Sequence, residues 1–331
     1  MKGVFKVSLL VLLLVMGKNS IAQVDPHFSQ YYVYPSWMNP AMTGVFDGTY
    51  RVSAIYRSQW SGIAGFNTPG VSFDMNTDKN ISFGASIMNL KAGNAGYNYL
   101  TAYGSASYSG IRFGTNGSQR VVFGMQAGIM NRRFDPNKFT VGENWNPSGP
   151  NPNPTTETFT RTSATMFDMG AGALYIDGKP GKKANFYGGL AVSHLTQPED
   201  DFIKDSDAKV PMRLTLHGGL RINVNENWSI TPNFLFLSQA QSRETMLGAY
   251  AQVRATPTSD FLFGANYRFK DAFAPYVGFY HKNFVLGASY DFNTSDLGRS
   301  STGANSFELS LTWLGRKAFK AEEEQFVCPR L

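Results

Sequence analysis

The chain has almost no cysteine and, after its first residues, no long apolar run. Cys328 is the single cysteine among 331 residues, which excludes a disulfide within the chain. After residue 22, no stretch reaches the roughly eighteen apolar residues that a membrane-spanning helix requires. These two absences exclude a disulfide-stabilised domain and a helical membrane protein.

Histidine is also scarce, and its spacing argues against catalysis. His27, His194, His217 and His281 are widely separated, and no Gly-x-Ser-x-Gly or paired-carboxylate motif accompanies them. The Ser193-His194 pair is the one hint of a surface hydrolase, but such a pair at a strand end is far more common without catalysis. No His/Cys cluster has the spacing of metal ligands. We therefore predict a protein without catalytic residues, metal ligands or cofactors.

Five acidic residues gather in one predicted loop, residues 196–209. They are Glu199, Asp200, Asp201, Asp205 and Asp207. The spacing lacks the glycine and the terminal glutamate of a calcium-binding loop, so a solvated acidic loop is the better interpretation. We expect Asp200 and Asp201 to be available to a basic partner.

The first 22 residues have the pattern of a secretory signal peptide. Lys2 and Lys6 precede an apolar stretch at residues 7–16, and small residues at Ser20 and Ala22 predict cleavage after Ala22. The apolar stretch, about ten residues, is too short to span a bilayer. Three of the 30 basic residues lie in this segment, which leaves 27 against 24 acidic residues in the mature chain. So small a basic excess does not favour nucleic acid as a partner.

Strict alternation of apolar and polar side chains is the strongest pattern in the chain. In residues 305–313 the large apolar members are Phe307, Leu309, Leu311 and Trp313, and polar side chains stand between them. Residues 261–270 and 284–292 repeat this alternation. One face of such a strand prefers hydrocarbon and the other prefers water. Many segments of about ten residues with this pattern are typical of a transmembrane β-barrel.

Fourteen segments with this character follow one another. They lie near 49–57, 70–76, 81–89, 97–109, 120–132, 163–176, 184–195, 211–224, 227–237, 244–255, 259–270, 273–281, 283–293 and 304–314. Short and long connections mostly alternate, as in outer-membrane barrels, whose short turns face the periplasm. The predicted fold is an all-β, antiparallel transmembrane barrel of about 14 strands in the outer membrane, with both termini periplasmic. The predicted parts are a signal peptide at 1–22, an N-terminal segment at 23–48, the barrel at 49–314 and a periplasmic tail at 315–331.

The N-terminal segment, residues 23–48, has no strand pattern but is rich in proline and aromatic residues. Its prolines predict an irregular or briefly helical path. Phe28, Tyr31 and Trp37 lie among aromatic neighbours that are too apolar to remain in water. We expect the segment to pack into the periplasmic mouth or the lumen of the barrel, and we count these three residues as candidate partner contacts.

Several charged residues lie on the polar face of their strands, which we expect to face the lumen. They are Arg51, Arg57, Arg213, His217, Arg221, Arg268, Lys270 and Glu308. A basic lumen could grip an acidic segment or select anions. The cations could instead pair with Asp74, Asp291 and Glu308 and brace a filled barrel. We favour bracing, because buried charges are usually paired.

Two further segments have a composition suited to partner contacts. The longest connection, residues 135–160, is polar and rich in proline and asparagine, and loops of that length are usually functional or mobile. Folding into the lumen and forming an outward lip are both open for it. In the tail, a charge run is followed by Phe326 and Cys328, which could dock on a periplasmic partner.

Ordered blocks of sequence resemble the PorP/SprF family of type IX secretion system membrane proteins. The blocks are residues 25–31 with 38–41, 56–60 with 72–74, 289–292 with 294–298, and the final 328–331. They follow the family order over essentially the whole mature chain, while the long 135–160 loop departs from the pattern. The resemblance implies an outer-membrane barrel in protein export, in some members tied to a gliding adhesin. It also implies partners, namely other type IX secretion components and the C-terminal domain of a secreted or adhesin protein.

Two functions from different classes follow from these observations. The resemblance favours a non-enzymatic secretion component that binds periplasmic machinery and an exported surface protein. Strand pattern and composition alone allow equally an outer-membrane channel or transporter for small or hydrophobic substrates.

Overall fold

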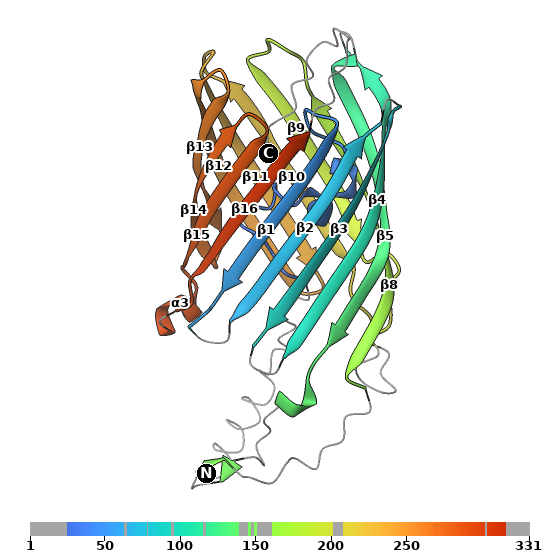
Figure 1. Ribbon diagram of the computed structural model, residues 1–331, viewed down its shortest axis with the longest axis vertical. Helices are drawn as coiled ribbons and strands as arrows, with labels where there is room; N and C mark the ends of the chain where they lie inside the picture. Colours follow the sequence, from blue (N-terminus) through green and yellow to red (C-terminus); the bar gives the residue numbers. More distant parts are fainter. Residues whose placement is uncertain are drawn as a thin grey trace, which may run out of the picture.

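The computed structural model describes residues 25–315 except 63–64, 78, 94–95, 115–116, 139–144, 147–148, 151–160, 201–207 and 302. Within these residues, fourteen antiparallel strands form one closed barrel (Figure 1). Each barrel strand pairs with the next one along the chain, and the first pairs with the last to close the sheet. The predicted fold class, an all-β barrel of about 14 strands, is confirmed.

The barrel strands agree with the predicted segments to within a few residues. They are β1 (Tyr50–Gln59), β2 (Phe66–Asn76), β3 (Ile81–Ala92), β4 (Tyr97–Phe113), β5 (Gln119–Arg133), β8 (Ser163–Asp177), β9 (Ala184–Ser193), β10 (Arg213–Asn223), β11 (Trp228–Gln239), β12 (Ser242–Thr256), β13 (Ser259–Arg268), β14 (Ala272–His281), β15 (Phe284–Asn293) and β16 (Ser306–Gly315). Outside the barrel wall lie η3 (Pro136–Lys138), the small pair β6 (Trp145–Asn146) and β7 (Gly149–Pro150), and α3 (Asp296–Ser300).

Apolar side chains cover the outer face of the barrel. Phe263, Tyr267, Leu309 and Trp313 are exposed, whereas Glu308, the neighbour of Leu309, is fully buried. The alternation in the sequence predicts this orientation, with Leu309 outward and Glu308 inward. A closed sheet pairs its backbone groups between strands, so it can present such a face to hydrocarbon. Among the described residues, no helix is both long and apolar enough to cross a membrane.

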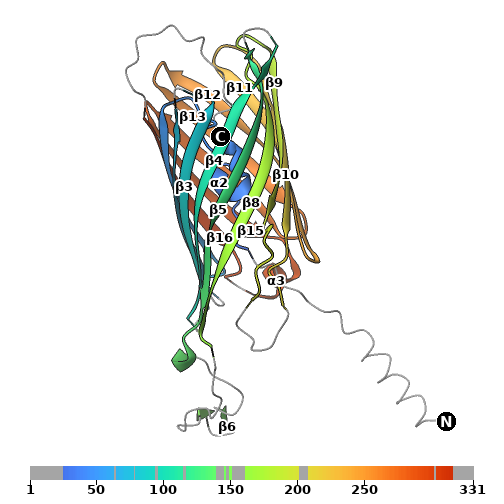
Figure 2. The same cartoon turned by 90° about the vertical axis from the view of Figure 1, so that its right-hand side faces the viewer.

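The connections at the two ends of the barrel differ in length. One end, the short-turn end, carries the links 77–80, 114–118, 178–183, 224–227, 257–258 and 282–283. The other end, the long-loop end, carries the links 60–65, 93–96, 134–162, 194–212, 240–241, 269–271 and 294–305. Figures 1 and 2 place η3, β6 and β7 beyond the ends of β5 and β8, outside the lumen. Of the two arrangements left open for the 135–160 loop, its described parts adopt the outward one.

Lys270 does not face the lumen, contrary to the prediction. It lies in the tight turn between β13 and β14 with a φ of 61°, and its side chain is exposed. The alternation of β13 ends at Arg268, so extending it by two residues was wrong.

Residues 25–45 lie inside the barrel. They include the short helices α2 (Pro35–Met38) and η1 (Pro40–Met42), which Figure 2 shows between the walls. Pro35 and Pro40 stand at the first positions of these helices, where the missing N–H costs nothing. The Asn39 side chain accepts a hydrogen bond from the backbone N–H of Ala41 at 2.9 Å and caps η1. We call residues 25–45 the lumen segment.

The lumen segment runs through the barrel from one end to the other. Asp25 contacts residues at the long-loop end of β9 and β10, and Thr49 donates to Gly315 at the short-turn end. The described chain therefore begins and ends at opposite ends of the barrel. That both true termini are periplasmic stays a prediction, because residues 1–24 and 316–331 lie outside the described part.

Candidate functional site

Aromatic side chains of the lumen segment form the centre of the barrel interior. Phe28, Tyr32 and Trp37 are each at most 6% exposed. The ring of Phe28 packs edge-on against Trp37 with centroids 5.5 Å apart, and Tyr32 meets Tyr276 of β14 in the same way at 5.8 Å. Fully burying a large apolar side chain stabilises by about 1.5–3 kcal/mol. Because several such rings are buried together, the segment fills the barrel interior with packed apolar side chains.

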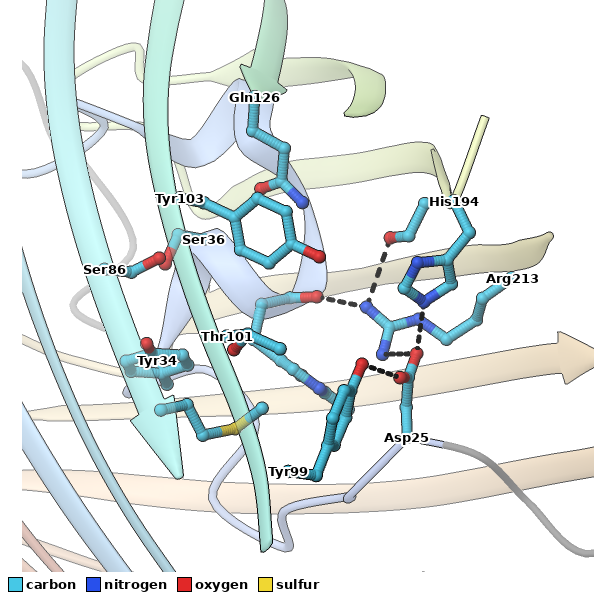
Figure 3. A pocket seen from close by; sticks show the side chains of 13 residues that line it. Asp25, Tyr34, Ser36, Ser86, Tyr99, Thr101, Tyr103, Gln126, His194 and Arg213 are labelled. Carbon is cyan, nitrogen blue, oxygen red and sulfur yellow. Dashed lines mark hydrogen bonds and ion pairs between the residues drawn. The ribbon is translucent and has the colours of Figure 1, made fainter. Parts of the chain in front are cut away.

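The first polar attachment holds Asp25 at the long-loop end. Its carboxylate lies 2.8 Å from Nε2 of His194 and 2.9 Å from Nη1 of Arg213, and it accepts from the Tyr99 hydroxyl at 3.0 Å. Nδ1 of His194 lies 2.9 Å from Asp168 on β8. Figure 3 shows His194, Arg213 and Tyr99 converging on Asp25. One carboxylate thus ties the lumen segment to β4, to β10 and to the residue that follows β9.

The two ionisable groups of this attachment favour their charged forms. Burial raises the pKa of Asp25, but the charges of His194 and Arg213 outweigh it and hold that pKa well below its usual range. Burial lowers the pKa of His194, but Asp25 and Asp168 outweigh it and raise the pKa to about 9. His194 is therefore a cation at neutral pH, donating from both nitrogens.

The Ser193-His194 pair is not arranged for hydrolysis. A protonated His194 has no lone pair with which to take a proton from a serine. The Ser193 hydroxyl instead accepts a hydrogen bond from Nη2 of Arg213 at 3.2 Å. Both residues serve the attachment of Asp25.

The second attachment joins Ser29 and Gln30 of the lumen segment to β15 and β16. The backbone N–H groups of Ser29 and Gln30 donate to the two carboxylate oxygens of Glu308 at 2.6 and 2.8 Å. The Ser29 hydroxyl donates to Asp291 at 2.8 Å. Two wall carboxylates thus satisfy backbone groups of a segment that has no regular secondary structure at this point.

Cations of the wall balance these carboxylates. Arg57 pairs with Glu308 and lies 2.9 Å from Asp291 through Nη2. Arg268 lies 2.9 Å from the same Asp291 oxygen through its own Nη2. All four side chains are at most 3% exposed. A buried network in which every charge is paired braces the wall and the segment together.

His27 is neutral within the same region. Burial, then the charges of Arg268 and Arg57, hold the pKa of His27 well below its usual range. Its Nε2 lies 3.2 Å from Nη2 of Arg57 and its Nδ1 3.3 Å from Glu244. A neutral ring can accept from the guanidinium and donate to the carboxylate, which fits both contacts.

The third attachment lies at the turn into η1. There, Nδ2 of Asn39 lies 3.0 Å from Nε2 of His217 on β10. The fourth attachment lies near the short-turn end, where Gly44 donates from its backbone to Asp74 at 2.7 Å and Arg51 lies 2.8 Å from that carboxylate. The lumen segment is thus held along its whole length.

A glycine of the wall makes room for η1. A Cβ at Gly124 would lie 2.3 Å from the backbone nitrogen of Ala41 and from the carbonyl carbon of Pro40. No side chain larger than hydrogen fits there unless the backbone moves. The close approach of η1 to β5 therefore requires glycine at this position.

A small polar cavity remains beside Asp25. It has a volume of about 30 Å³, which is enough for one or two waters. Ser36 Oγ, Gln126 Oε1 and Arg213 Nε border it and have no hydrogen-bond partner in the described part of the chain. Figure 3 shows these side chains around the space. Bound water would satisfy the three atoms.

The structure places the predicted lumen charges as follows. Arg51, Arg57, Arg213, His217, Arg268 and Glu308 are at most 5% exposed, and Arg221 is half-buried near the short-turn end. Most of these charges pair with acidic residues of the wall or of the lumen segment. This arrangement supports bracing over a basic lumen open to anions.

The predicted partner contacts are placed differently. Phe28, Tyr31 and Trp37 are buried in the barrel, so a partner reaches them only if the lumen segment leaves. Asp200 pairs with Arg132. Asp201, Phe326 and Cys328 lie outside the described residues. A partner role for these residues stays a prediction.

Sequence reasoning missed Asp25, Ser29, Asn39 and Asp168 as members of the site. In the sequence, Asp25 stands out only as part of a family block, and no periodicity marks residues of an irregular segment. One signal was available. A segment expected inside a charged lumen must bring polar groups to meet those charges.

Together, the closed barrel, its apolar outer face and its filled interior define an outer-membrane β-barrel whose lumen is occupied by its own N-terminal region. The chain belongs to the PorP/SprF family, described as type IX secretion system membrane protein PorP/SprF, which matches residues 20–313. A search of curated proteins found no match.

Solved structures with a similar barrel include transporters of aromatic hydrocarbons. The toluene transporter TbuX of Ralstonia pickettii is 13% identical, with a TM-score of 0.51 over 86% of this chain and 93% of that one. The monoaromatic hydrocarbon channel CymD is 10% identical, with a TM-score of 0.48 over 90% and 96%. The toluene transporter TodX of P. putida is 12% identical, with a TM-score of 0.46 over 83% and 92%. At these identities the likeness shows the fold alone.

Proposed function

We propose that this protein is a non-enzymatic outer-membrane component of type IX secretion that binds periplasmic machinery and an exported surface protein, such as a gliding adhesin. One observation carries the proposal beyond the family. The lumen is occupied by residues 25–45, which are bonded to the wall along their whole length. A barrel filled in this way is better suited to binding than to conduction.

The surfaces that remain for partners are the two ends of the barrel. The outer face is apolar and suits lipid, and the inner face is committed to the lumen segment. Outer-membrane barrels keep short turns in the periplasm and long loops outside. By that rule, the tail and the short-turn end would meet periplasmic machinery. The 134–162 and 194–212 loops would meet the exported protein.

Copurification tests the proposal. The full-length protein, tagged and solubilised from the outer membrane in detergent, should retain type IX components and a protein with a secretion-specific C-terminal domain. A barrel truncated after residue 315 is the matched comparison, and it should lose periplasmic partners while keeping the exported one. If mass spectrometry finds none of these proteins above an untagged control, the proposal is wrong.

A channel or transporter for small or hydrophobic substrates is the second candidate, because the barrel is similar to that of a toluene transporter. An aromatic cavity in the lumen, bordered by Tyr32, Tyr250, Leu262 and Tyr276, measures only about 30 Å³. A cavity that holds benzene is roughly five times larger. Conductance or toluene uptake by the intact protein would favour this candidate.

A further inference from the structure

A pocket lined by cations opens at the long-loop end, beside β3, β4 and β5. Its volume is about 550 Å³, and Figure 1 shows the three strands side by side in the wall. Its charged residues are Lys91, Arg133, Asp135 and Lys138. With three cations and one carboxylate, the pocket has a net positive charge. We call it the basic pocket.

Strand register places the key residues of the basic pocket on the outer face. Lys91 of β3 pairs with Asn98 of β4, which pairs with Arg133 of β5. The inward members of these strands include Tyr99, which reaches Asp25 in the lumen. Because side chains alternate, the adjacent Asn98 faces outward. Asn98 is buried, and the exposed Lys91 and Arg133 stand on either side of it.

The basic pocket lies beyond the edge of the apolar belt on the outer face. Ile87 lies four residues before Lys91 on β3 and also points outward. It pairs with Ala102 of β4, which pairs with Ile129 of β5, and Ile129 pairs in turn with Phe167 of β8. Ile87, Ile129 and Phe167 are 47–58% exposed. Four residues of strand span roughly 13 Å. The cations therefore lie roughly 13 Å beyond an apolar surface that suits acyl chains.

Two of the cations have no carboxylate partner among the described residues. Lys138 has its Nζ 4.0 Å from Asp135. Among the residues that the structure describes, neither Lys91 nor Arg133 pairs with a carboxylate. An anion from outside the chain would complete the basic pocket.

We propose that the basic pocket binds the phosphate headgroup of an anionic lipid in the membrane leaflet at the long-loop end. Lys91 and Arg133 pair with the phosphate, and the Asn98 amide lies between them as a further donor. The acyl chains lie along Ile87, Ile129 and Phe167. A lipid fits better than a soluble anion, because exposed apolar side chains of the same strands lie roughly 13 Å from the pocket, within reach of acyl chains. Clustered basic side chains at a membrane interface bind such headgroups.

Native mass spectrometry of the detergent-purified, full-length protein tests this inference. Phosphatidic acid is the probe, and phosphatidylcholine is the zwitterionic comparison. The wild type should retain phosphatidic acid preferentially. The double variant K91Q/R133Q should bind it about thirty-fold more weakly, because each lost cation near the surface weakens headgroup binding several-fold. R243Q is the matched control, since Arg243 is an exposed cation of β12 at the same end.

Heat-modifiable migration on gels confirms that each variant is folded, and the single variants K91Q and R133Q replace the double variant if it is not. Binding by K91Q/R133Q equal to that of the wild type would overturn the inference. So would an equal loss in R243Q, which would show general surface charge instead of a site. Displacement of phosphatidic acid by inorganic phosphate at an equal concentration would identify a free-phosphate site and would equally exclude the lipid.

Discussion

The carboxylate of Asp25 and the imidazole of His194 lie 2.8 Å apart, although 169 positions separate them in the sequence. Asp25 is the first described residue of the lumen segment, and His194 directly follows β9. This contact fixes the segment at the long-loop end of the barrel. The buried cluster around it couples the position of the segment to the charge of two side chains.

The first prediction is that this contact responds to pH at both extremes. The pKa of His194 rises from 6.5 to about 9 on folding, so its contribution is complete below pH 6.5 and is lost as the pH rises through about 9. The pKa of Asp25 falls from 3.8, so its contribution is present above pH 3.8 and is lost as the pH falls through the lower, folded value. Thermal transitions followed by tryptophan fluorescence should show an alkaline loss of stability that H194N lacks. Identical alkaline profiles for both proteins would contradict this.

The second prediction concerns the glycine beneath η1. G124A should cost about 1–3 kcal/mol, because its Cβ overlaps backbone atoms of Ala41 and Pro40 that cannot rotate away. G104A on the neighbouring strand β4 is the control, since its Cβ has only the carbonyl oxygen of Ala127 within reach, at 3.9 Å. Urea unfolding in detergent measures both free energies. Equal costs would show that the close approach of η1 does not matter.

The third prediction concerns the lipid-facing surface. L309R should cost on the order of 2–4 kcal/mol if position 309 lies near the bilayer midplane, because a charge would replace an exposed apolar side chain of β16. A spin label at 309 should report lipid. A label at the exposed position 281, at the end of β14, should report water. Water contact at 309 would mean that the register of β16 is wrong.

The fourth prediction is that the lumen segment closes the barrel. Deleting residues 25–44 should leave the wall assembled, because Glu308 and Asp291 keep their pairing with Arg57 and Arg268. The truncated protein should conduct ions in a planar bilayer, and the intact protein should not. As a control, a chain with residues 316–331 removed should stay closed. Equal conductance with and without the lumen segment would refute a closing role.

The fifth prediction places client recognition in the longest loop. Shortening the 135–160 loop should preserve heat-modifiable migration, because β5 ends at Arg133 and β8 begins at Ser163. It should lower the surface display of one or a few exported proteins, since the strands are committed to closure and recognition is left to the loops. Flow cytometry of labelled cells measures the display, with an unrelated outer-membrane protein as the reference. Normal display would move recognition to the short-turn end.

Local pattern was enough to determine the barrel wall and its two faces. In β16 a side chain every second residue is apolar, and hydrocarbon accepts only that face, so Leu309 must point outward and Glu308 inward. A sheet in lipid must close to pair its backbone, which also determined the class of fold. The crowded aromatics of residues 28–37 indicated that the segment would be buried.

Only the tertiary structure decided which groups meet inside that wall. Closing the sheet brings β1 against β16, so Arg57 reaches Glu308 across 251 positions. The lumen segment has no periodicity that could assign Asp25 to His194 or Asn39 to His217, and its direction through the barrel leaves no trace in local composition. Such contacts depend on distances across a closed lumen. Alternation along a strand sets which way a side chain points, but barrel closure and the path of the segment set what it touches.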